Sequence, residues 1–278
     1  MTAPAVAPRE ITGDEFRYIC ELLHRLTGIR LVPGKEALVM GRLDKQLRIL
    51  GLTTYSEYFQ FIRMPENDAE LRSAIDLLTT NETFFFRESQ HFDFLRQVIV
   101  PARDAGRPFR LWSAASSSGE EAYTAAMVLS ESLSAAPWEI IGTDISSRVV
   151  ERARRGIYPI AAAEKIPMPL LRKYCRRGKD DYDGLMAVSP ELRGKVTFHA
   201  ANLLEDLRQF GRFDVIMLRN VMIYFDNDTK IGLVTRLQEM LQPGGHFIIS
   251  LSETLNGIPS KLRMVQPSVY RLDGPGRG

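Results

Sequence analysis

Apolar residues at helical spacing dominate the first eighty residues, and no run there is typical of a strand. In the segment 12–27, apolar residues recur three or four positions apart, as on one face of a helix. Thr12 precedes Glu15 by three residues, the arrangement of an N-terminal capping box, and Gly28 follows as a stop signal. Further segments of this kind cover residues 34–50, 55–64 and 69–78. Four short helices with short connections predict a small bundle.

Beyond residue 109 the pattern changes to short apolar runs that alternate with helical segments. Strands are predicted over residues 110–115, 139–144, 196–199, 213–218 and 246–251. Helices are predicted over residues 120–133, 146–155 and 228–241. Such alternation indicates a doubly wound parallel sheet, in which right-handed crossovers put the carboxyl ends of the strands along one ligand-binding edge. The predicted fold class is α/β, preceded by a helical domain.

Residues 159–195 interrupt this alternation with several prolines and a basic cluster at 172–177. A structureless loop of this length is unusual in a compact domain, so we predict a small inserted subdomain. The predicted organisation is a helical domain over residues 1–80 and a second domain over 81–278 that contains the insertion.

Composition limits the partners and the compartment. A net charge of +2 over 278 residues does not by itself indicate a nucleic-acid partner. The chain has no run of eighteen apolar residues, so we expect no insertion into a membrane. The first eight residues lack the basic start and apolar stretch of a signal peptide. Two cysteines without C-x-x-C spacing suit a reducing compartment, and we expect a cytoplasmic protein.

The most informative segment follows the first predicted strand. Residues 113–119 are all small, and Glu120 and Glu121 then begin a helix. Small side chains let the backbone approach a ligand closely, but two acids at a helix N-terminus repel a phosphate. A ligand with positive groups fits better, and S-adenosylmethionine carries an ammonium and a sulfonium. The alternative is a plain strand-to-helix turn with an acidic first turn.

Asp144 ends the second predicted strand, 25 residues after Gly119. Nucleotide-binding α/β folds place the acid that binds a ribose about 20 residues past their glycines. The spacing therefore favours a ribose contact, with an ordinary turn or cap before Ser146 as the alternative.

Two more predicted strands end in polar residues at the same edge. Asn202 and the backbone of Leu203 are suited to reading an adenine edge. Arg219 and Asn220 directly follow a buried run, where polar groups are costly unless they meet water, a ligand or a partner.

Three motifs resemble those of the chemotaxis receptor methyltransferases, the CheR family, over nearly the whole chain. They are Asn81 to Arg87, Trp112 to Glu121 and Arg219 to Phe225. One departure is the triplet at 116–118, Ser-Ser-Ser where many relatives have Cys-Ser-Thr. The resemblance implies a Rossmann-like class I methyltransferase domain with an amino-terminal helical domain and a small β-rich insertion.

The resemblance also implies an activity and roles for individual residues. The activity is methyl esterification of glutamate side chains on chemoreceptors, with S-adenosylhomocysteine as the second product and no metal. Cofactor contacts are implied for Asn81, Thr83, Arg87, Glu121, Asp144, Asn202, Leu203, Arg219 and Asn220. Whether Glu120 or Glu121 meets the methionine amino group stays open.

Esterification of glutamate requires little acid–base catalysis from the protein. A glutamate with a pKa of about 4.3 is already ionised at neutral pH, so no general base is required. None of the four histidines falls in a cofactor motif. Arg87 is suited to pairing with a carboxylate, and Tyr224 to aiming its hydroxyl at the incoming carboxylate. The alternatives are a linker cap for Arg87 and a core aromatic for Tyr224.

The second predicted helix carries a basic face opposite its leucines, formed by Lys35, Arg42, Lys45 and Arg48. Such faces are usually only solvated, but in the CheR family the corresponding helix is thought to dock on the acidic cytoplasmic helices of the receptor. This docking would recruit the protein to receptor arrays. Some relatives hold a receptor carboxy-terminal peptide in the inserted subdomain, and the sequence leaves this open here.

Two rival functions remain. A methyltransferase acting on RNA or on a small molecule would share the cofactor site, but no aromatic platform accompanies the basic face. A non-catalytic adaptor that senses S-adenosylmethionine is the other.

Overall fold

The computed structural model divides the chain into two compact units, a helical unit that extends to Thr80 and includes Tyr224–Asp226, and a larger unit formed by the remainder. The residues described are 9–104, 106–133 and 136–273. The first eight residues, considered above for a signal peptide, lie outside this set. In the described part of the chain, no helix combines the length and apolar character needed to cross a membrane.

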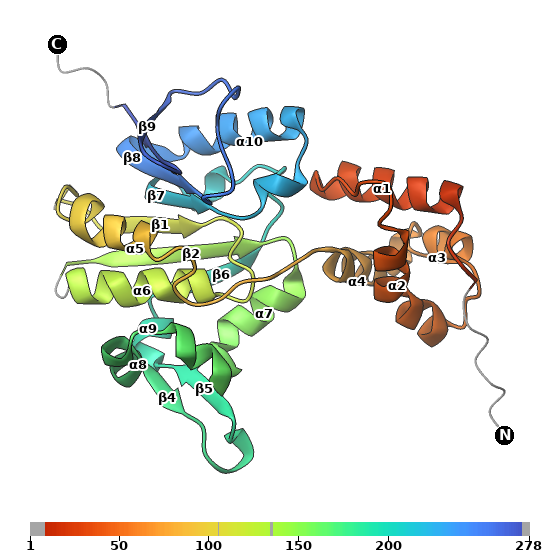
Figure 1. The fold of residues 1–278 in the computed structure, drawn as a ribbon, viewed down its shortest axis with the longest axis horizontal. Coiled ribbons are helices and arrows are strands. Elements are labelled where there is room, and N and C mark those ends of the chain that lie inside the picture. The colour runs from red at the N-terminus through yellow and green to blue at the C-terminus, as the bar shows by residue number, and fades with distance from the viewer. Residues whose placement is uncertain (1–8, 105, 134–135, 274–278) are drawn as a thin grey trace. The chain divides into compact units, whose positions relative to one another are not determined.

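Four helices form the helical unit (Figure 1). They are α1 (Gly13–Thr27), α2 (Glu36–Leu50), α3 (Tyr55–Phe61) and α4 (Asp68–Leu78), with a short 3-10 turn, η1 (Pro65–Asn67), before α4. The capping box of α1 is confirmed, because Thr12 Oγ1 accepts from Glu15 N at 3.3 Å and Glu15 Oε2 accepts from Thr12 N at 2.9 Å. Gly28 ends α1 with a φ of 75°. The predicted bundle is therefore present.

Two helix ends differ from the prediction for local reasons. α2 begins at Glu36 rather than at Gly34, because Gly34 has a φ of 87°, outside the helical region. α3 ends at Phe61 rather than at residue 64. The chain tightens there into turns as it approaches Pro65, since the residue before a proline disfavours helical geometry.

The apolar face of α2 supplies the centre of this unit's core. Val39, Leu43 and Leu47 are fully buried, at the 3.6-residue period that places them on one side of the helix. Tyr55 and Tyr58 of α3 are buried against the same core and direct their hydroxyls to Asp44 and Glu70. The polar tips are thus satisfied while the rings fill the interior.

A seven-stranded sheet with the order β6-β2-β1-β7-β8-β10-β9 forms the larger unit. The strands are β1 (Phe109–Ser113), β2 (Trp138–Asp144), β6 (Val196–Ala200), β7 (Phe213–Leu218), β8 (Leu241–Ile249), β9 (Leu262–Gln266) and β10 (Val269–Leu272). The first five strands in that order are parallel, which confirms the predicted α/β class. The last two form an antiparallel hairpin, so the complete sheet is mixed.

Helices pack against this sheet and share its apolar core. They are α5 (Gln90–Phe94) with the π-helical turn η2 (Leu95–Ile99), α6 (Glu120–Ser132), α7 (Ser147–Arg155) and α10 (Asn227–Glu239). The core joins residues of α5 and α6 to β1 and β2. The sequence pattern predicted α6, α7 and α10 but assigned no element to α5 or to β9.

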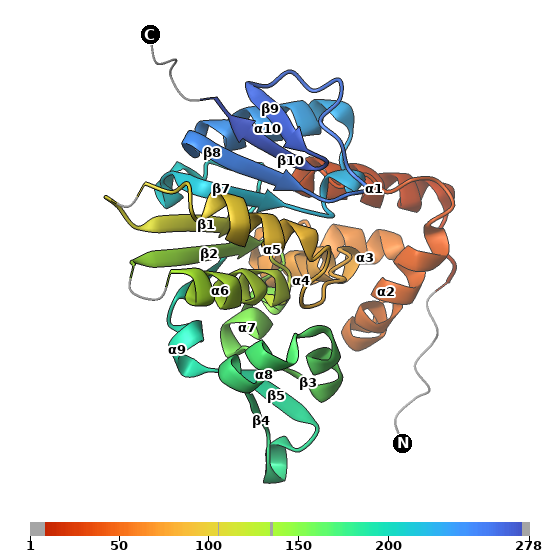
Figure 2. The ribbon, with the colours of Figure 1, turned by 60° about the vertical axis from the view of Figure 1, so that its left-hand side comes forward.

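The inserted segment forms its own three-stranded antiparallel sheet with the order β3-β5-β4 (Figure 2). Its elements are β3 (Ile157–Pro159), η3 (Ile160–Lys165), α8 (Met168–Tyr174), β4 (Cys175–Arg177), η4 (Asp180–Tyr182), β5 (Leu185–Val188) and α9 (Pro190–Arg193). Tyr158, Met186 and Val188 are buried and continue the core of the larger unit. The insertion therefore contains a small β-sheet together with short helices, and it is a subdomain and not a loop.

Gly142 of β2 leaves room for the Phe198 ring of the neighbouring strand β6. A Cβ at this position would lie 2.5 Å from Cδ1 of the buried Phe198 ring and 3.1 Å from Ser116 Oγ. We expect Gly142→Ala to lower the free energy of unfolding by about 1–3 kcal/mol through overpacking. Denaturant unfolding measures this. The matched control is Gly41→Ala in α2, where nothing lies within 4 Å of the new methyl group. Equal stability of the two variants would contradict the expectation.

Candidate functional site

The loop between β1 and α6 is shaped by a close approach to the rest of the larger unit. Gly119 precedes α6 with a φ of 96°, and a Cβ there would lie 2.9 Å from Ala153 Cβ. Ser117 also has a positive φ, of 48°. The loop therefore needs small residues for its own geometry, and the same residues leave its backbone accessible to a ligand.

Asp144 holds this loop in place from the end of β2. Its Oδ2 accepts from Ser117 N at 2.9 Å, and its Oδ1 accepts from Ser146 N at 3.0 Å. Ser146 in turn caps α7 by accepting from Val149 N. The turn role considered for Asp144 is thus present. The ribose role of Asp144 stays a prediction.

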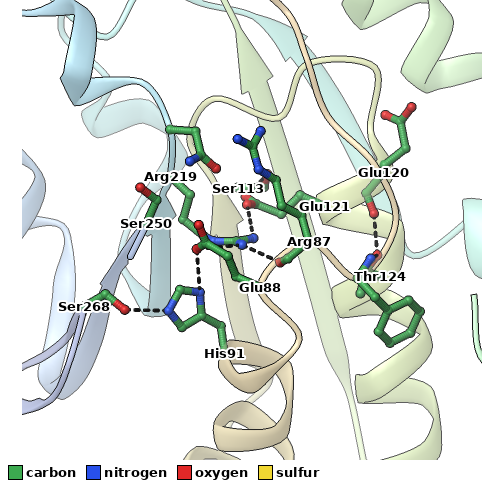
Figure 3. Close-up of polar contacts among 12 residues, drawn as sticks. Arg87, Glu88, His91, Ser113, Glu120, Glu121, Thr124, Arg219, Ser250 and Ser268 are labelled. Carbon is green, nitrogen blue, oxygen red and sulfur yellow. Dashed lines mark hydrogen bonds and ion pairs between the residues drawn. The ribbon is translucent and has the colours of Figure 1, made fainter. Parts of the chain in front are cut away.

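Glu121 and Arg219 form the centre of a buried polar network (Figure 3). Glu121 Oε1 accepts from Ser113 Oγ at 2.7 Å, and its Oε2 accepts from Arg219 Nη1 at 2.8 Å. Arg219 Nη2 donates to Glu88 Oε2 at 3.1 Å and to the backbone oxygen of Arg87. Burial raises the pKa of Glu121, against the opposing effect of Arg219. Two largely buried carboxylates therefore share one guanidinium.

The neighbouring Glu120 takes a different direction. Its side chain points away from Arg219 in Figure 3 and accepts from Ser118 Oγ at 2.8 Å. Burial raises the pKa of Glu120 as well. The sequence did not distinguish Glu120 from Glu121. In the structure, only Glu121 of the two belongs to the network around Arg219.

The segment before α5 reaches this network through its backbone. Asn81 O accepts from Ser117 Oγ at 2.9 Å, which ties the segment to the loop after β1. The Arg87 side chain is half-buried, donates to Glu82 O at 2.9 Å and lies over the Phe84 ring, 5.6 Å from its centre. Thr83 is half-buried between these residues. The proposed contacts of Asn81, Thr83 and Arg87 therefore come from one segment.

Asn202 and Leu203 follow β6 next to Asp144. Ala201 N donates to Asp144 O at 2.9 Å, which places this turn beside the end of β2. Asn202 Oδ1 accepts from Leu204 N at 3.0 Å, and Leu203 O accepts from Arg236 Nη2 at 3.1 Å. Both residues are half-buried.

His91 completes the network, and sequence reasoning gave it only a core or surface role. The ring is fully buried, with Nε2 at 2.6 Å from Ser268 Oγ and Nδ1 at 3.4 Å from Glu88 Oε2. Ser268 Oγ also donates to Pro267 O at 2.6 Å. Burial and Arg219 lower the pKa of His91 to about 4, against the opposing effect of Glu88. His91 is therefore neutral at physiological pH.

The predicted catalytic Tyr224 belongs to the helical unit, whereas Arg87 belongs to the larger one. Arg30 N donates to Tyr224 O at 2.8 Å. His24 Nε2 lies 2.7 Å from Asp226 Oδ2, so the short segment at 224–226 is anchored at both ends. The Tyr224 side chain is half-buried.

The four basic residues of the α2 region are not equivalent. Lys35 and Lys45 are exposed. Arg42 is half-buried and donates to Leu78 O at 2.6 Å, to Thr79 O at 3.2 Å and to Thr80 Oγ1 at 3.1 Å. Arg48 Nη2 lies 3.7 Å from Asp44 Oδ2. Arg42 thus holds the carboxyl end of α4, a contact that its position in the sequence did not indicate.

The chemistry of the network fits a ligand that carries a positive group. Glu121 and Glu88 bring two negative charges, and Arg219 balances one of them. Arg219 Nε and Ser116 Oγ are buried without a hydrogen-bond partner among the described residues, which leaves polar atoms for a ligand to satisfy. In the same part of the chain, no three His, Cys, Asp or Glu side chains gather as metal ligands would.

Comparisons with known proteins bear on both units. Two family models match the chain, "CheR methyltransferase, all-alpha domain" over residues 14–79 and "CheR methyltransferase, SAM binding domain" over residues 81–271. Chemotaxis protein methyltransferase 2 of Pseudomonas aeruginosa is 39% identical over 262 residues, which cover 93% of each chain. The chemotaxis protein methyltransferase of Salmonella typhimurium is 38% identical, covering 94% of this chain and 91% of the relative. The chemotaxis protein methyltransferase of Escherichia coli is 37% identical, covering 94% of this chain and 92% of the relative.

Two buried histidines should make stability depend on pH. Burial lowers the pKa of both His91 and His246 to about 4 in the folded chain. As the pH falls through about 6.5, these histidines take up protons in the unfolded chain. In the folded chain they do so only when the pH is near 4, so stability is lost across this window. His91 alone accounts for a loss of roughly 3 kcal/mol in the free energy of unfolding at the lower end of this window. Denaturant unfolding from pH 7 to 4 measures the slope. His91→Gln and His246→Gln should each flatten it, and an unchanged slope in both variants would contradict the expectation.

Proposed function

Because this chain belongs to the CheR methyltransferase family, we propose that it transfers a methyl group from S-adenosylmethionine to glutamate side chains of chemoreceptors. The products are the glutamate methyl ester and S-adenosylhomocysteine. One observation carries the proposal. Within the family's S-adenosylmethionine-binding domain, six of the proposed cofactor residues lie at or after the carboxyl ends of β1, β2, β6 and β7, where parallel sheets bind their ligands: Glu121, Asp144, Asn202, Leu203, Arg219 and Asn220.

Each part of the cofactor has a suitable group in this site. Glu121 is the proposed acceptor for the methionine ammonium, supported by its place between Ser113 and Arg219. Asp144 is the proposed acceptor for the ribose hydroxyls, supported by its fixed position at the end of β2. Asn202 and the backbone of Leu203 are proposed to read the adenine edge. The remaining proposed contacts are made by Asn81, Thr83, Arg87, Arg219 and Asn220.

The proposed chemistry depends on positioning. Bound S-adenosylmethionine supplies a methyl group on a sulfonium, which is an electrophile with a good leaving group. The glutamate carboxylate has a pKa of about 4.3 and attacks in its ionised form, so the protein needs no general base. Arg87 is proposed to orient a carboxylate through its guanidinium, and Tyr224 through its hydroxyl. His91 is proposed to take no part in proton transfer. Its pKa is low, and its Nε2 is hydrogen-bonded to Ser268.

The proposed protein partner is the cytoplasmic helical bundle of membrane chemoreceptors. This assignment places the protein in the cytoplasm, recruited to receptor arrays. Lys35, Lys45 and Arg48 are exposed in the α2 region, and Arg48 Nη2 lies 3.7 Å from Asp44 Oδ2, so the two lysines are the proposed contacts for an acidic partner. Arg42 has a structural role in addition to any contact with a receptor, because it donates to three oxygen atoms at the end of α4.

The activity is tested by incubating the protein with labelled S-adenosylmethionine and receptor-containing membranes. We expect label on the receptor that alkali releases as methanol, because esters hydrolyse in base and N-methyl groups do not. Alkali-stable label would indicate a different nucleophile. Binding of S-adenosylhomocysteine without label transfer to receptors would support the adaptor alternative.

Receptor docking is tested by the double charge reversal Lys35→Glu, Lys45→Glu. We expect the affinity for S-adenosylhomocysteine to stay the same while receptor methylation falls, because the two lysines belong to the helical unit and the proposed cofactor-binding residues belong to the larger unit. Wild-type methylation should also fall as salt rises, since charges screen one another beyond about 8 Å at physiological ionic strength. The control is Lys261→Glu, an exposed lysine of the larger unit. If the double variant methylates receptors like the wild type with the same salt response, the basic face is only solvated.

A further inference from the structure

The loops at the carboxyl ends of β7 and β8 meet at a single carboxylate, that of Glu253. Its Oε2 accepts from Asn220 N at 3.1 Å and from Ser250 N at 2.9 Å. Its Oε1 accepts from Ile223 N at 3.3 Å. The bond from Ser250 closes the local turn after β8. The other two reach residues 33 and 30 positions earlier in the chain, in the segment that carries the proposed site residues Arg219 and Asn220.

The segment 219–223 needs such support because its backbone is irregular. Asn220 has a φ of 57°, a left-handed conformation that is uncommon outside glycine, although asparagine adopts it more readily than most residues. A single 3-10 turn, η6 (Met222–Tyr224), follows it. The amide of Asn220 before this turn and that of Ile223 within it donate to Glu253, so the carboxylate fixes the segment at two points three residues apart.

A second carboxylate holds the same β8 loop from the other side. Leu251 N donates to Glu88 Oε2 at 3.3 Å, and Glu88 Oε2 also accepts from Arg219 Nη2 at 3.1 Å. Consecutive amides of the β8 loop, those of Ser250 and Leu251, are thus bound by Glu253 and Glu88. Glu253 sets the backbone of the 219–223 segment, and Glu88 receives the side chain of Arg219.

We propose that Glu253 is a positioning residue of the cofactor site, which holds the 219–223 segment in the conformation that receives S-adenosylmethionine. This inference rests on the proposed function, because it assigns Arg219 and Asn220 to that cofactor. Glu253 acts through these residues. When a binding conformation is populated only in part, the apparent dissociation constant rises in inverse proportion to its population, so loosening the segment weakens binding.

The test compares the wild type with Glu253→Gln, which preserves the size of the side chain. The amide presents one oxygen where the carboxylate presents two, and its NH2 group faces at least one backbone N–H. Titration calorimetry with S-adenosylhomocysteine should show binding weaker by roughly tenfold, the change that corresponds to about 1.4 kcal/mol. Hydrogen exchange should become faster at the amides of Asn220 and Ile223, and saturating S-adenosylhomocysteine should slow it again. The matched control is Glu239→Gln at the exposed end of α10, which should resemble the wild type in both measurements.

Steady-state kinetics distinguish positioning from general destabilisation. If Glu253 positions the segment, Glu253→Gln should have a higher KM for S-adenosylmethionine than the wild type. Its kcat at saturating cofactor should be close to that of the wild type, because the bound cofactor selects the ordered segment. Unchanged affinity, or unchanged exchange at Asn220 and Ile223, would overturn the proposal. Faster exchange throughout the sheet would do so too, since it indicates a purely structural role. If Glu253→Gln does not fold, Glu253→Asp carries the same test, with an intermediate affinity expected because it keeps the charge and loses reach.

The exchange comparison also separates this proposal from the proposed function. It needs only the folded protein, so it answers whether Glu253 holds the segment even if no receptor is methylated. A wild type that binds no S-adenosylhomocysteine would instead defeat the proposed function.

Discussion

The guanidinium of Arg219 lies between two carboxylates, and the arrangement of the larger unit at this edge of its sheet depends on that interaction. Glu121 comes from the first turn of α6, Glu88 from the segment before α5, and Arg219 from the end of β7. Breaking a buried ion pair by removing one partner typically costs about 3–5 kcal/mol, because the other charge is left unpaired. The flat, forked geometry of arginine satisfies both acids and the Arg87 carbonyl together, which a lysine ammonium does not match.

The same interaction explains why the site suits a cationic ligand. One guanidinium cannot balance two carboxylates, and the neutral His91 beside Glu88 adds no positive charge. Burial raises the pKa of Glu121, and a positive group beside it would favour the ionised carboxylate. A phosphate would make this imbalance worse, whereas an ammonium would correct it. The network around Arg219 therefore gives a physical explanation for the acidic first turn of α6.

Local features were predictable from the sequence, and contacts across the chain were not. The cap at Thr12 and the place of Asp144 follow from short spacings. The different environments of Glu120 and Glu121 do not, because adjacent residues on a helix point about 100° apart and only the fold decides which direction meets Arg219. Glu253 carried no signal either, since nothing in its own segment indicates that it accepts amide protons from a loop thirty residues away. Similarly, the π-helical turn η2 lacks the regular period that reveals an α-helix.

Burial also decides what the basic residues are able to do. Arg42 and Arg219 both donate to backbone oxygens of their own units, those of Leu78 and Arg87, so each stabilises its unit before it meets a ligand or a partner. Lys35 and Lys45 have exposed side chains, and their charge acts outward over the Debye length of about 8 Å. Recognition of an acidic protein and organisation of the cofactor site can therefore change independently. Under the proposed function, exposed charges on the helical unit recognise the receptor, and the buried charges of the larger unit hold the loops where methyl transfer is proposed to occur.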